Sequence, residues 1–346
     1  MTYAGICVFG LGKLGACLCA VLAEAGHQVA GYDTNLDAVK AISHAQPLTY
    51  EPGLKELLEA HRGAISASTD SEEALSNSSI AYIIVPTPSG PDGAFDNGYV
   101  EAALRQIGTH LRRFPRQFTV IIASTVMPGS CDEVFIPLLE QESGLRVGVD
   151  VGLVYSPEFI ALGQVIQDMR FPDLILVGQS DVHFGGIAAD IARSVVKNSP
   201  EFRTMSLSSA ELTKIAVNTF VTTKISFANM LSEICDVLPG ANIDDVTGAV
   251  GADSRIGHRY LKGALGYGGP CFPRDNVALT KAAEHRGVSA DIPVATDAIN
   301  DRQVDRVVSL VRDLSDPSDS IVIVGLAYKS DTPVIDASQG IQIGQS

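Results

Sequence analysis

The chain has 346 residues, more than one domain usually contains, so two or three domains are expected. Hydrophobic residues make up 46% of the sequence and charged residues 19%, without low-complexity tracts, which excludes a disordered chain. A formal net charge of -15 argues against binding of nucleic acid, and no uninterrupted apolar run is long enough to cross a membrane. The six scattered cysteines predict neither a disulfide framework nor a zinc site and favour a reducing cytoplasm.

The N-terminal part of the chain alternates between short apolar runs and helical patterns. Residues 5–9 read as a buried strand, a helical pattern follows from Lys13 to Ala25, and a second strand ends at Asp33. Further strand-like runs lie at residues 80–85, 119–123, 152–155 and 174–177. This alternation predicts an α/β fold, a Rossmann-like doubly wound parallel sheet with helices on both faces, over residues 1–198.

Helical patterns dominate the middle of the chain. Residues 206–238 contain neither proline nor glycine and predict a long helix, which suits a connecting spine or a subunit interface. We expect a central helical domain over residues 199–315. The apolar run from Ile321 to Tyr328 then predicts a buried strand that opens another α/β domain at residues 316–346, where too little chain follows to close it.

A glycine-rich turn follows the first predicted strand. Because glycines allow a tight turn and let backbone amides approach a pyrophosphate at a helix N-terminus, this arrangement predicts dinucleotide binding. Asp33, at the end of the second strand, is suited to accept hydrogen bonds from ribose hydroxyls and to repel a 2′-phosphate, which favours NAD over NADP. The alternative is a turn that only packs a helix onto the sheet. The motif reads Gly10-Leu11-Gly12-Lys13-Leu14-Gly15.

Three more polar loops follow predicted strands, at the sheet edge where ligands of doubly wound folds bind. Two of them, with Pro86 and Thr87 in one and Thr125 in the other, are interpreted as cofactor loops, although each alone also reads as an ordinary turn. The third places Glu158 and Phe159 beyond a strand end, where a carboxylate can position water or act as a base. An exposed structural glutamate is the alternative there.

The helical part of the chain carries the strongest chemical motif, Gly266-Tyr-Gly-Gly-Pro-Cys271-Phe-Pro-Arg-Asp275. A helix starting after the glycines would place the Cys271 thiol at a helix N-terminus, where a lowered thiol pKa favours a nucleophile. Asp275 is placed to assist proton transfer. Lys214 and Asn218 share one face of the long helix and are suited to stabilise an oxyanion, or to form a structural ion pair and hydrogen bond.

Together these motifs resemble those of the UDP-glucose/GDP-mannose dehydrogenase family, in order from Gly10 to about Lys329. The resemblance implies an NAD-dependent, four-electron oxidation of a nucleotide-sugar C6 alcohol to a carboxylate, through a cysteine thioester. It implies that Cys271 is the nucleophile and Asp275 its helper, and that Thr125 and Glu158 manage water. Lys214 and Asn218 resemble the oxyanion-stabilising pair.

The same resemblance extends to substrate contacts. Arg255 is similar to a family arginine that reaches the substrate across a dimer interface, which implies a homodimer, and Lys329 is similar to a substrate-contacting lysine. Further expected substrate contacts are Phe159, Tyr267 and Gly268. The chain departs from the family pattern at Leu162, where many members are polar, and at Asp336, in a region where an arginine is usual.

The sequence leaves two other functions open. A two-electron hydroxy-acid or 3-hydroxyacyl dehydrogenase of the same superfamily would share the glycine turn and the long helix but would not need Cys271. A catalytically silent binding subunit would use neither hydride transfer nor the thiol. UDP-glucose is the leading substrate candidate, ahead of GDP-mannose and UDP-N-acetylhexosamines.

Overall fold

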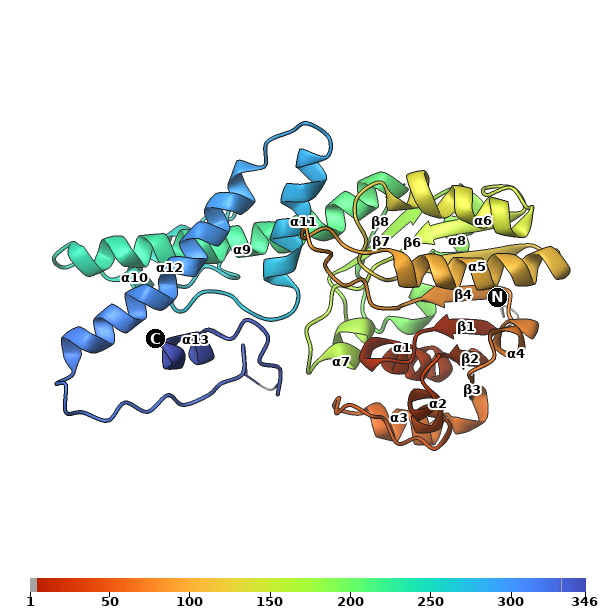
Figure 1. The fold of residues 1–346 in the computed structure, drawn as a ribbon, viewed down its shortest axis with the longest axis horizontal. Coiled ribbons are helices and arrows are strands. Elements are labelled where there is room, and N and C mark those ends of the chain that lie inside the picture. Colours follow the sequence, from red (N-terminus) through yellow and green to blue (C-terminus); the bar gives the residue numbers. More distant parts are fainter. Residues whose placement is uncertain (1–4, 331) are drawn as a thin grey trace. The chain divides into compact units, whose positions relative to one another are not determined.

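The structure is a computed structural model that describes residues 5–330 and 332–346, and the chain forms two compact units (Figure 1). Unit 1 consists of Met1–Pro88 and Phe95–Lys214, and unit 2 of Ser89–Ala94 and Ile215–Ser346. The division falls within helix α9 (Leu207–Val237), which belongs to both units. Among the described residues, no helix combines the length and apolar character that a membrane span requires.

Unit 1 is built on an eight-stranded sheet in the order β3-β2-β1-β4-β5-β6-β7-β8. The order reverses between β1 and β4, as in doubly wound dinucleotide-binding folds, and this point is where such folds bind their ligands. The strands are β1 (Ile6–Phe9), β2 (Val29–Tyr32), β3 (Ile65–Ser68), β4 (Ile80–Ile83), β5 (Phe118–Ile122), β6 (Val151–Tyr155), β7 (Leu174–Gln179) and β8 (Glu201–Ser206).

Helices cover both faces of this sheet, so its central strands are buried on both sides. One apolar core lies under α1, α2, α3, α7 and α8, and the other lies under α4, α5, α6 and the start of α9. The predicted α/β class with helices on both faces is therefore confirmed. The helices are α1 (Lys13–Glu24), α2 (Leu36–Ser43), α3 (Leu54–Ala60), η1 (Arg62–Ala64), α4 (Ser71–Ser76), α5 (Gly98–Arg113), η2 (Cys131–Phe135), α6 (Ile136–Ser143), α7 (Val165–Arg170) and α8 (Val182–Val195).

The sheet is parallel, as predicted, except in one pairing. β7 runs antiparallel to β6, while all other neighbouring strands are parallel. The two edge strands, β3 and β8, had no apolar run that would predict them. Because an edge strand is covered on fewer sides, its sequence can stay polar, as in Glu201–Ser206.

Unit 2 is helical within its described residues. Besides its share of α9, it contains α10 (Ile243–Ala252), α11 (Phe272–Glu284), α12 (Asp291–Leu314) and α13 (Gln339–Gln345). The short segment Ser89–Ala94 also belongs to this unit, and the Arg274 guanidinium on α11 donates to the Ser89 hydroxyl at 3.0 Å. The predicted long helix is confirmed with nearly the expected ends.

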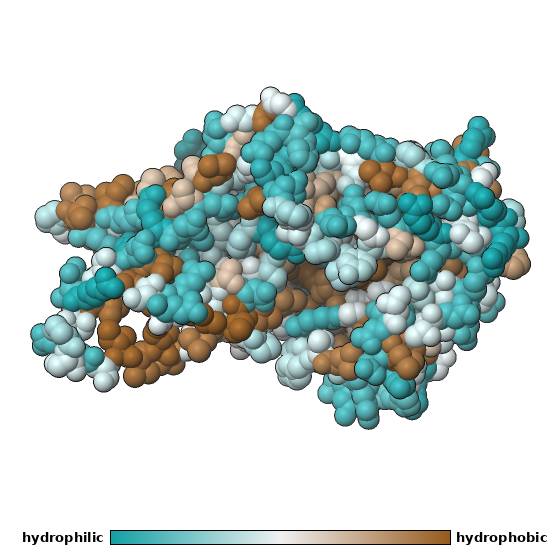
Figure 2. Space-filling model, viewed as in Figure 1, coloured by the Kyte–Doolittle hydropathy of each residue, from teal (hydrophilic) through white to brown (hydrophobic). Residues whose placement is uncertain are grey.

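The buried strand predicted from Ile321 to Tyr328 is wrong. This segment has no strand structure, and several of its apolar side chains are exposed, including Val322 and Val324. Figure 2 shows the resulting hydrophobic band along the C-terminal segment at lower left. A parallel strand needs neighbours for its backbone hydrogen bonds, and the described part of unit 2 contains no other strand with which the segment could pair.

Candidate active site

The turn between β1 and α1 leaves room at the helix N-terminus. Gly10 has a φ of +99°, and a Cβ on Gly15 would lie 1.8 Å from the Gly10 carbonyl oxygen, so neither position tolerates a side chain. A Cβ on Gly12, by contrast, would meet no atom within 4 Å. Gly12 is also the N-cap of α1, and no side chain caps that helix.

Asp33 lies at the carboxyl end of β2 and stabilises this turn. Its carboxylate accepts hydrogen bonds from the backbone N–H groups of Leu11, at 2.7 Å, and of Asn35, at 2.8 Å. Each carboxylate oxygen keeps a further lone pair for a ribose hydroxyl. The open Gly12 position, the uncapped helix N-terminus and this acidic residue fit the pyrophosphate and adenosine ribose of NAD.

Lys13 and Leu14 begin α1, and the Lys13 side chain leads to a residue that sequence reasoning missed. Its ammonium group lies 3.5 Å from the carboxylate of Glu51, which is buried. Glu51 also accepts hydrogen bonds from the backbone N–H groups of Gly163 and Val165, at the start of α7. Sequence gives no signal for this role, because Glu51 lies in a loop far along the chain from α7.

The loops after β4 and β5 are joined by hydrogen bonds. The Ser124 hydroxyl accepts from the Val85 N–H at 2.9 Å and donates to the Val85 carbonyl at 2.7 Å. The Thr87 hydroxyl, next to Pro86, donates to the Thr125 carbonyl at 2.6 Å. The structure thus brings the two predicted cofactor loops together at the carboxyl edge of the sheet.

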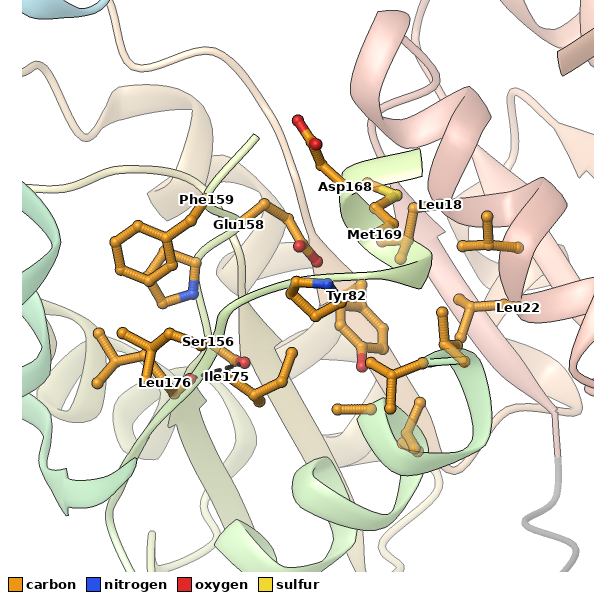
Figure 3. A pocket seen from close by; sticks show the side chains of 18 residues that line it. Leu18, Leu22, Tyr82, Ser156, Glu158, Phe159, Asp168, Met169, Ile175 and Leu176 are labelled. Carbon is orange, nitrogen blue, oxygen red and sulfur yellow. Dashed lines mark hydrogen bonds between the residues drawn. The ribbon is translucent and has the colours of Figure 1, made fainter. Parts of the chain in front are cut away.

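Glu158 and Phe159 follow β6 at the same edge, and the structure brings Lys214 to them. The Lys214 ammonium donates to the backbone carbonyl of Glu158 at 2.6 Å and lies 4.5 Å from the centre of the Phe159 ring. Glu158 and Phe159 line a cavity of about 40 Å³, which is large enough for water. Tyr82 and Ser156 line the same cavity (Figure 3).

The surroundings of Glu158 alter its ionisation. Loss of hydration raises the pKa of its carboxyl to about 7, and this effect outweighs the opposite influence of the Lys214 ammonium. A carboxyl group that titrates near neutrality can accept a proton from water and release it again. Glu158 is therefore suited to act as a general base.

Glu211, one turn before Lys214 in α9, is a second residue that sequence reasoning missed. Its buried carboxylate accepts from the backbone N–H groups of Gly129, at 2.6 Å, and Cys131, at 2.8 Å. These contacts attach the start of α9 to the loop that follows Thr125. The position of Glu211 three residues before Lys214 was the available signal, since it lies near the same helix face.

In unit 2, Cys271 occupies the N-cap position of α11, and no side chain caps this helix. The structure thus places the thiol at a helix N-terminus, as the glycines before it predict. All six cysteines lie among the described residues, and Cys271 is the exposed one. Burial raises the pKa of the thiols of Cys17 and Cys19 to about 12, so these remain protonated at neutral pH.

Asp275 and Asn218 are brought together in the same unit. Asp275 is buried in the first turn of α11, and its backbone N–H donates to the Cys271 carbonyl at 2.9 Å. The Asn218 side-chain amide, on α9, donates to the Asp275 carboxylate at 2.6 Å. A hydrogen-bonded Asp–Asn pair therefore stands one helical turn from the thiol.

The remaining predicted substrate residues lie in unit 2 and differ in burial and in their contacts. Tyr267 is buried and its hydroxyl donates to Asp297, while a Cβ on Gly268 would lie 2.2 Å from a backbone oxygen. Arg255 is highly exposed and pairs with Asp253 at 2.6 Å, two residues earlier. The Lys329 ammonium lies 5.9 Å from the ring centre of Tyr328.

Leu162 and Asp336 are the two positions at which the sequence departs from the family pattern. Leu162 is partly buried against the apolar core of unit 1. The backbone carbonyl of Asp336 accepts a hydrogen bond from the Gly269 N–H at 2.9 Å, so this region contacts the Cys271 turn through its main chain.

Comparisons with known proteins agree on one family. Residues 4–198 match the NAD binding domain of the UDP-glucose/GDP-mannose dehydrogenase family, and residues 208–302 match its central domain. The chain is 36% identical to the UDP-glucose 6-dehydrogenase of Haloferax volcanii, over 98% of the chain and 79% of that protein. It is 31% identical to the GDP-mannose 6-dehydrogenase of Pseudomonas aeruginosa, over 98% and 78% of the two chains.

A solved structure gives the same result. A UDP-glucose dehydrogenase from Pyrobaculum islandicum superimposes with a TM-score of 0.90 at 33% identity, covering 99% of this chain and 79% of that one.

Proposed function

Because the chain belongs to the UDP-glucose/GDP-mannose dehydrogenase family, whose members are NAD-dependent nucleotide-sugar 6-dehydrogenases, we propose that it oxidises UDP-glucose to UDP-glucuronate. The cofactor is NAD. The observation that carries the covalent part of the proposal is the position of Cys271, an exposed thiol at the N-terminus of α11 with the Asp275–Asn218 pair one turn away. A simple hydroxy-acid dehydrogenase has no use for this thiol.

The reaction consumes one sugar, two NAD and one water. NAD, when bound, supplies the hydride acceptor for both oxidations. In the first oxidation the C6 alcohol becomes an aldehyde, with loss of a hydride from C6 and a proton from the hydroxyl. The Cys271 sulfur then bonds to C6 and the aldehyde oxygen takes up a proton, which gives a thiohemiacetal. The second two-electron oxidation gives the thioester, and water cleaves its C–S bond to form the acid and restore the thiol.

Each group of side chains has a distinct part in these steps. Asp275 exchanges protons near the thiol, and Asn218 holds its carboxylate while donating to developing negative charge. In unit 1, Lys214 contributes positive charge that stabilises an oxyanion. Glu158 removes a proton from the hydrolytic water, for which its pKa of about 7 is well matched, and Thr125 orients that water.

Cofactor binding uses the main chain of unit 1 and the carboxylate of Asp33. The pyrophosphate binds the amides at the start of α1, from Gly10 to Gly15 including Lys13 and Leu14, and Asp33 binds the adenosine ribose. Pro86, Thr87 and Thr125 line the cofactor at the sheet edge. This assignment is supported by the open Gly12 position and the uncapped helix.

Substrate contacts and assembly complete the proposal. Phe159, Lys329 and the main chain of Tyr267 and Gly268 contact the nucleotide sugar, and Arg255 reaches the substrate of a second copy in a homodimer. The exposed Arg255 side chain, which pairs with Asp253 two residues earlier, is compatible with that reach. The enzyme acts in the cytoplasm, in keeping with six cysteines that form no disulfide.

The test is the number of NADH molecules released per sugar. Purified protein is incubated with NAD and, separately, limiting UDP-glucose, GDP-mannose or UDP-N-acetylhexosamines. Two NADH per UDP-glucose, with UDP-glucuronate as product, would support the proposal. One NADH would support a two-electron dehydrogenase, and none with any sugar would support a silent binding subunit. A higher kcat/KM for another sugar would overturn the choice of UDP-glucose.

A further inference from the structure

The turn that carries Cys271 is held by a buried network of side-chain hydrogen bonds. Tyr267 is 6% exposed, and its hydroxyl donates to a carboxylate oxygen of Asp297 on α12. Asn276, which is 0% exposed, donates from its side-chain amide to the Tyr267 hydroxyl at 3.0 Å and to the same Asp297 oxygen at 2.7 Å. These three side chains close the segment from Tyr267 to Asn276, which contains Cys271.

The network continues from α11 to α9. The Asn276 side-chain oxygen accepts from the Thr222 hydroxyl at 3.0 Å, one helical turn beyond the hydrogen bond between Asn218 and Asp275. α11 is thus attached to α9 through two successive residues, Asp275 and Asn276. Any shift of Asn276 must move Asp275 as well, because both side chains project from the same helical turn.

The main chain of Tyr267 is fixed from the same side. Its N–H donates to the Asn300 side-chain oxygen at 2.7 Å, and its carbonyl accepts from the Asn300 amide at 3.1 Å. The edge of its ring also meets the ring of Phe272, the first residue of α11, with centroids 6.3 Å apart. Buried and bonded to Asp297, the Tyr267 hydroxyl has a raised pKa and stays protonated, so it remains a donor.

From this geometry we infer that Tyr267 and Asp297 are positioning residues that set the orientation of Cys271 and Asp275. The inference rests on the proposed nucleophilic role of Cys271. Tyr267 closes the turn ahead of the thiol, Asp297 accepts two hydrogen bonds on one oxygen, and Asn276 transmits that constraint to the first turn of α11. A buried network of this kind specifies one arrangement when every member is satisfied and loses it when one is removed.

Three variants separate position from charge. Tyr267→Phe deletes the hydroxyl, and Asp297→Leu deletes the acceptor with little change of size. Asp297→Asn keeps an oxygen that can accept both hydrogen bonds while removing the charge. Ser226→Ala is the matched control, because Ser226 is buried and its hydroxyl donates to the Thr296 backbone carbonyl at 2.8 Å, which joins α9 to α12 outside the Cys271 turn.

Two measurements are made on each intact protein. The first is the rate of Cys271 alkylation by iodoacetamide as a function of pH, without cofactor or sugar, with the modified peptide identified by mass spectrometry. The second is steady-state kinetics with NAD and UDP-glucose. We expect Tyr267→Phe and Asp297→Leu to lower kcat by about tenfold or more, to alter the pH profile of alkylation, and to leave the KM for NAD unchanged. Asp297→Asn should retain at least about half of the wild-type kcat.

The control variant shows what loss of a hydrogen bond outside the turn should do. Ser226→Ala should lower the unfolding temperature without changing either alkylation or kcat, since its hydrogen bond does not touch the turn. If Tyr267→Phe behaves like Ser226→Ala, the positioning role is wrong. It is also wrong if Asp297→Asn is as impaired as Asp297→Leu, because charge and not placement would then matter. Alkylation needs no substrate, so absence of turnover with every sugar would reject the proposed function while leaving this test valid.

Discussion

The β1–α1 turn of unit 1 and the Cys271 turn of unit 2 both place a proposed functional site at the N-terminus of a helix, by different means. In the first, glycines remove side chains, so that backbone amides face open space at Gly12. In the second, Cys271 occupies the N-cap of α11, and hydrogen bonds among the side chains of Tyr267, Asn276 and Asp297 fix the turn that carries it. The first arrangement depends on a few glycines close in sequence, and the second on partners from α9 and α12.

This difference predicts different sensitivities. A main-chain site is damaged by adding atoms at its glycines, whereas a site held by buried hydrogen bonds is damaged by removing atoms from residues that never touch the substrate. A buried donor or acceptor left without its partner costs about 1 to 3 kcal/mol. Substitutions in the two regions can therefore test whether they depend on different kinds of contact.

The largest effect is expected at the thiol itself. Cys271→Ala should reduce formation of the acid by at least about a thousandfold, because no thiohemiacetal or thioester can form. NADH release and product are measured together by absorbance and mass spectrometry. The control is Cys235→Ala, which removes a partly buried cysteine outside the turn and should keep full activity.

A positive result would come from trapping the intermediate on the wild-type chain. The mass added by the sugar acyl group should map to the peptide that contains Cys271. Acid formation by Cys271→Ala at the wild-type rate would reject covalent catalysis.

Glu158→Gln should have the next largest effect. Loss of the general base is expected to slow thioester hydrolysis by about a hundredfold and to let the acyl-enzyme accumulate. In the wild type, the rate of this step should rise with pH through about 7, as the carboxyl ionises. Rapid-quench measurement of the acyl-enzyme at several pH values checks both points, and the same pH dependence in Glu158→Gln would contradict the assignment.

The raised pKa of Glu158 also predicts how stability depends on pH. Because its folded-state pKa of about 7 lies above the ordinary value of 4.5, the protonated form is favoured in the folded protein. This contribution is fully present below pH 4.5 and is lost as the pH rises through about 7. Urea unfolding of both proteins across this range should show the decline in the wild type and not in Glu158→Gln.

A smaller effect is expected at Asp33. Asp33→Ala should weaken NAD binding and reduce the preference for NAD over NADP, each by about tenfold, since a charged hydrogen-bond acceptor and a repulsive charge are both lost. Asp181→Ala is the control, because Asp181 also accepts a backbone N–H, at 2.8 Å, but caps α8. Calorimetric titration with both cofactors measures the effect, and an unchanged NAD to NADP ratio would contradict the ribose assignment.

The fold of unit 1 could be predicted because its signals are local. Each central strand is a continuous apolar run, and the glycine turn and Asp33 stand at fixed positions relative to two of those runs. The polar edge strand Glu201–Ser206 carries no such run and was missed. The Cys271 motif was also readable, because its residues are adjacent in sequence.

What could not be predicted are contacts between residues far apart in the chain. Glu51 bonds to the start of α7, and Asp297 bonds to Tyr267, across long stretches of sequence. Neither carboxylate stands in a recognisable pattern, because its partner is brought to it only by packing of the helices. The prediction for the segment from Ile321 to Tyr328 was wrong although its signal is local. Its pattern is that of a buried strand, but the described part of unit 2 contains no strand with which it could pair.

The smallest effect, on the free energy of unfolding, is expected in the segment from Ile321 to Tyr328. A substitution there tests whether its apolar side chains contribute to a core. Val324 is 93% exposed, so Val324→Ser removes almost no buried surface and should change the free energy of unfolding by less than about 0.5 kcal/mol. Val177, in β7, is 0% exposed, and Val177→Ser should cost about 2 to 4 kcal/mol, since it leaves a cavity and buries a hydroxyl. Urea unfolding followed by circular dichroism compares the two. A loss at Val324 similar to that at Val177 would show that the side chain of Val324 is packed in a core, as the apolar pattern predicts.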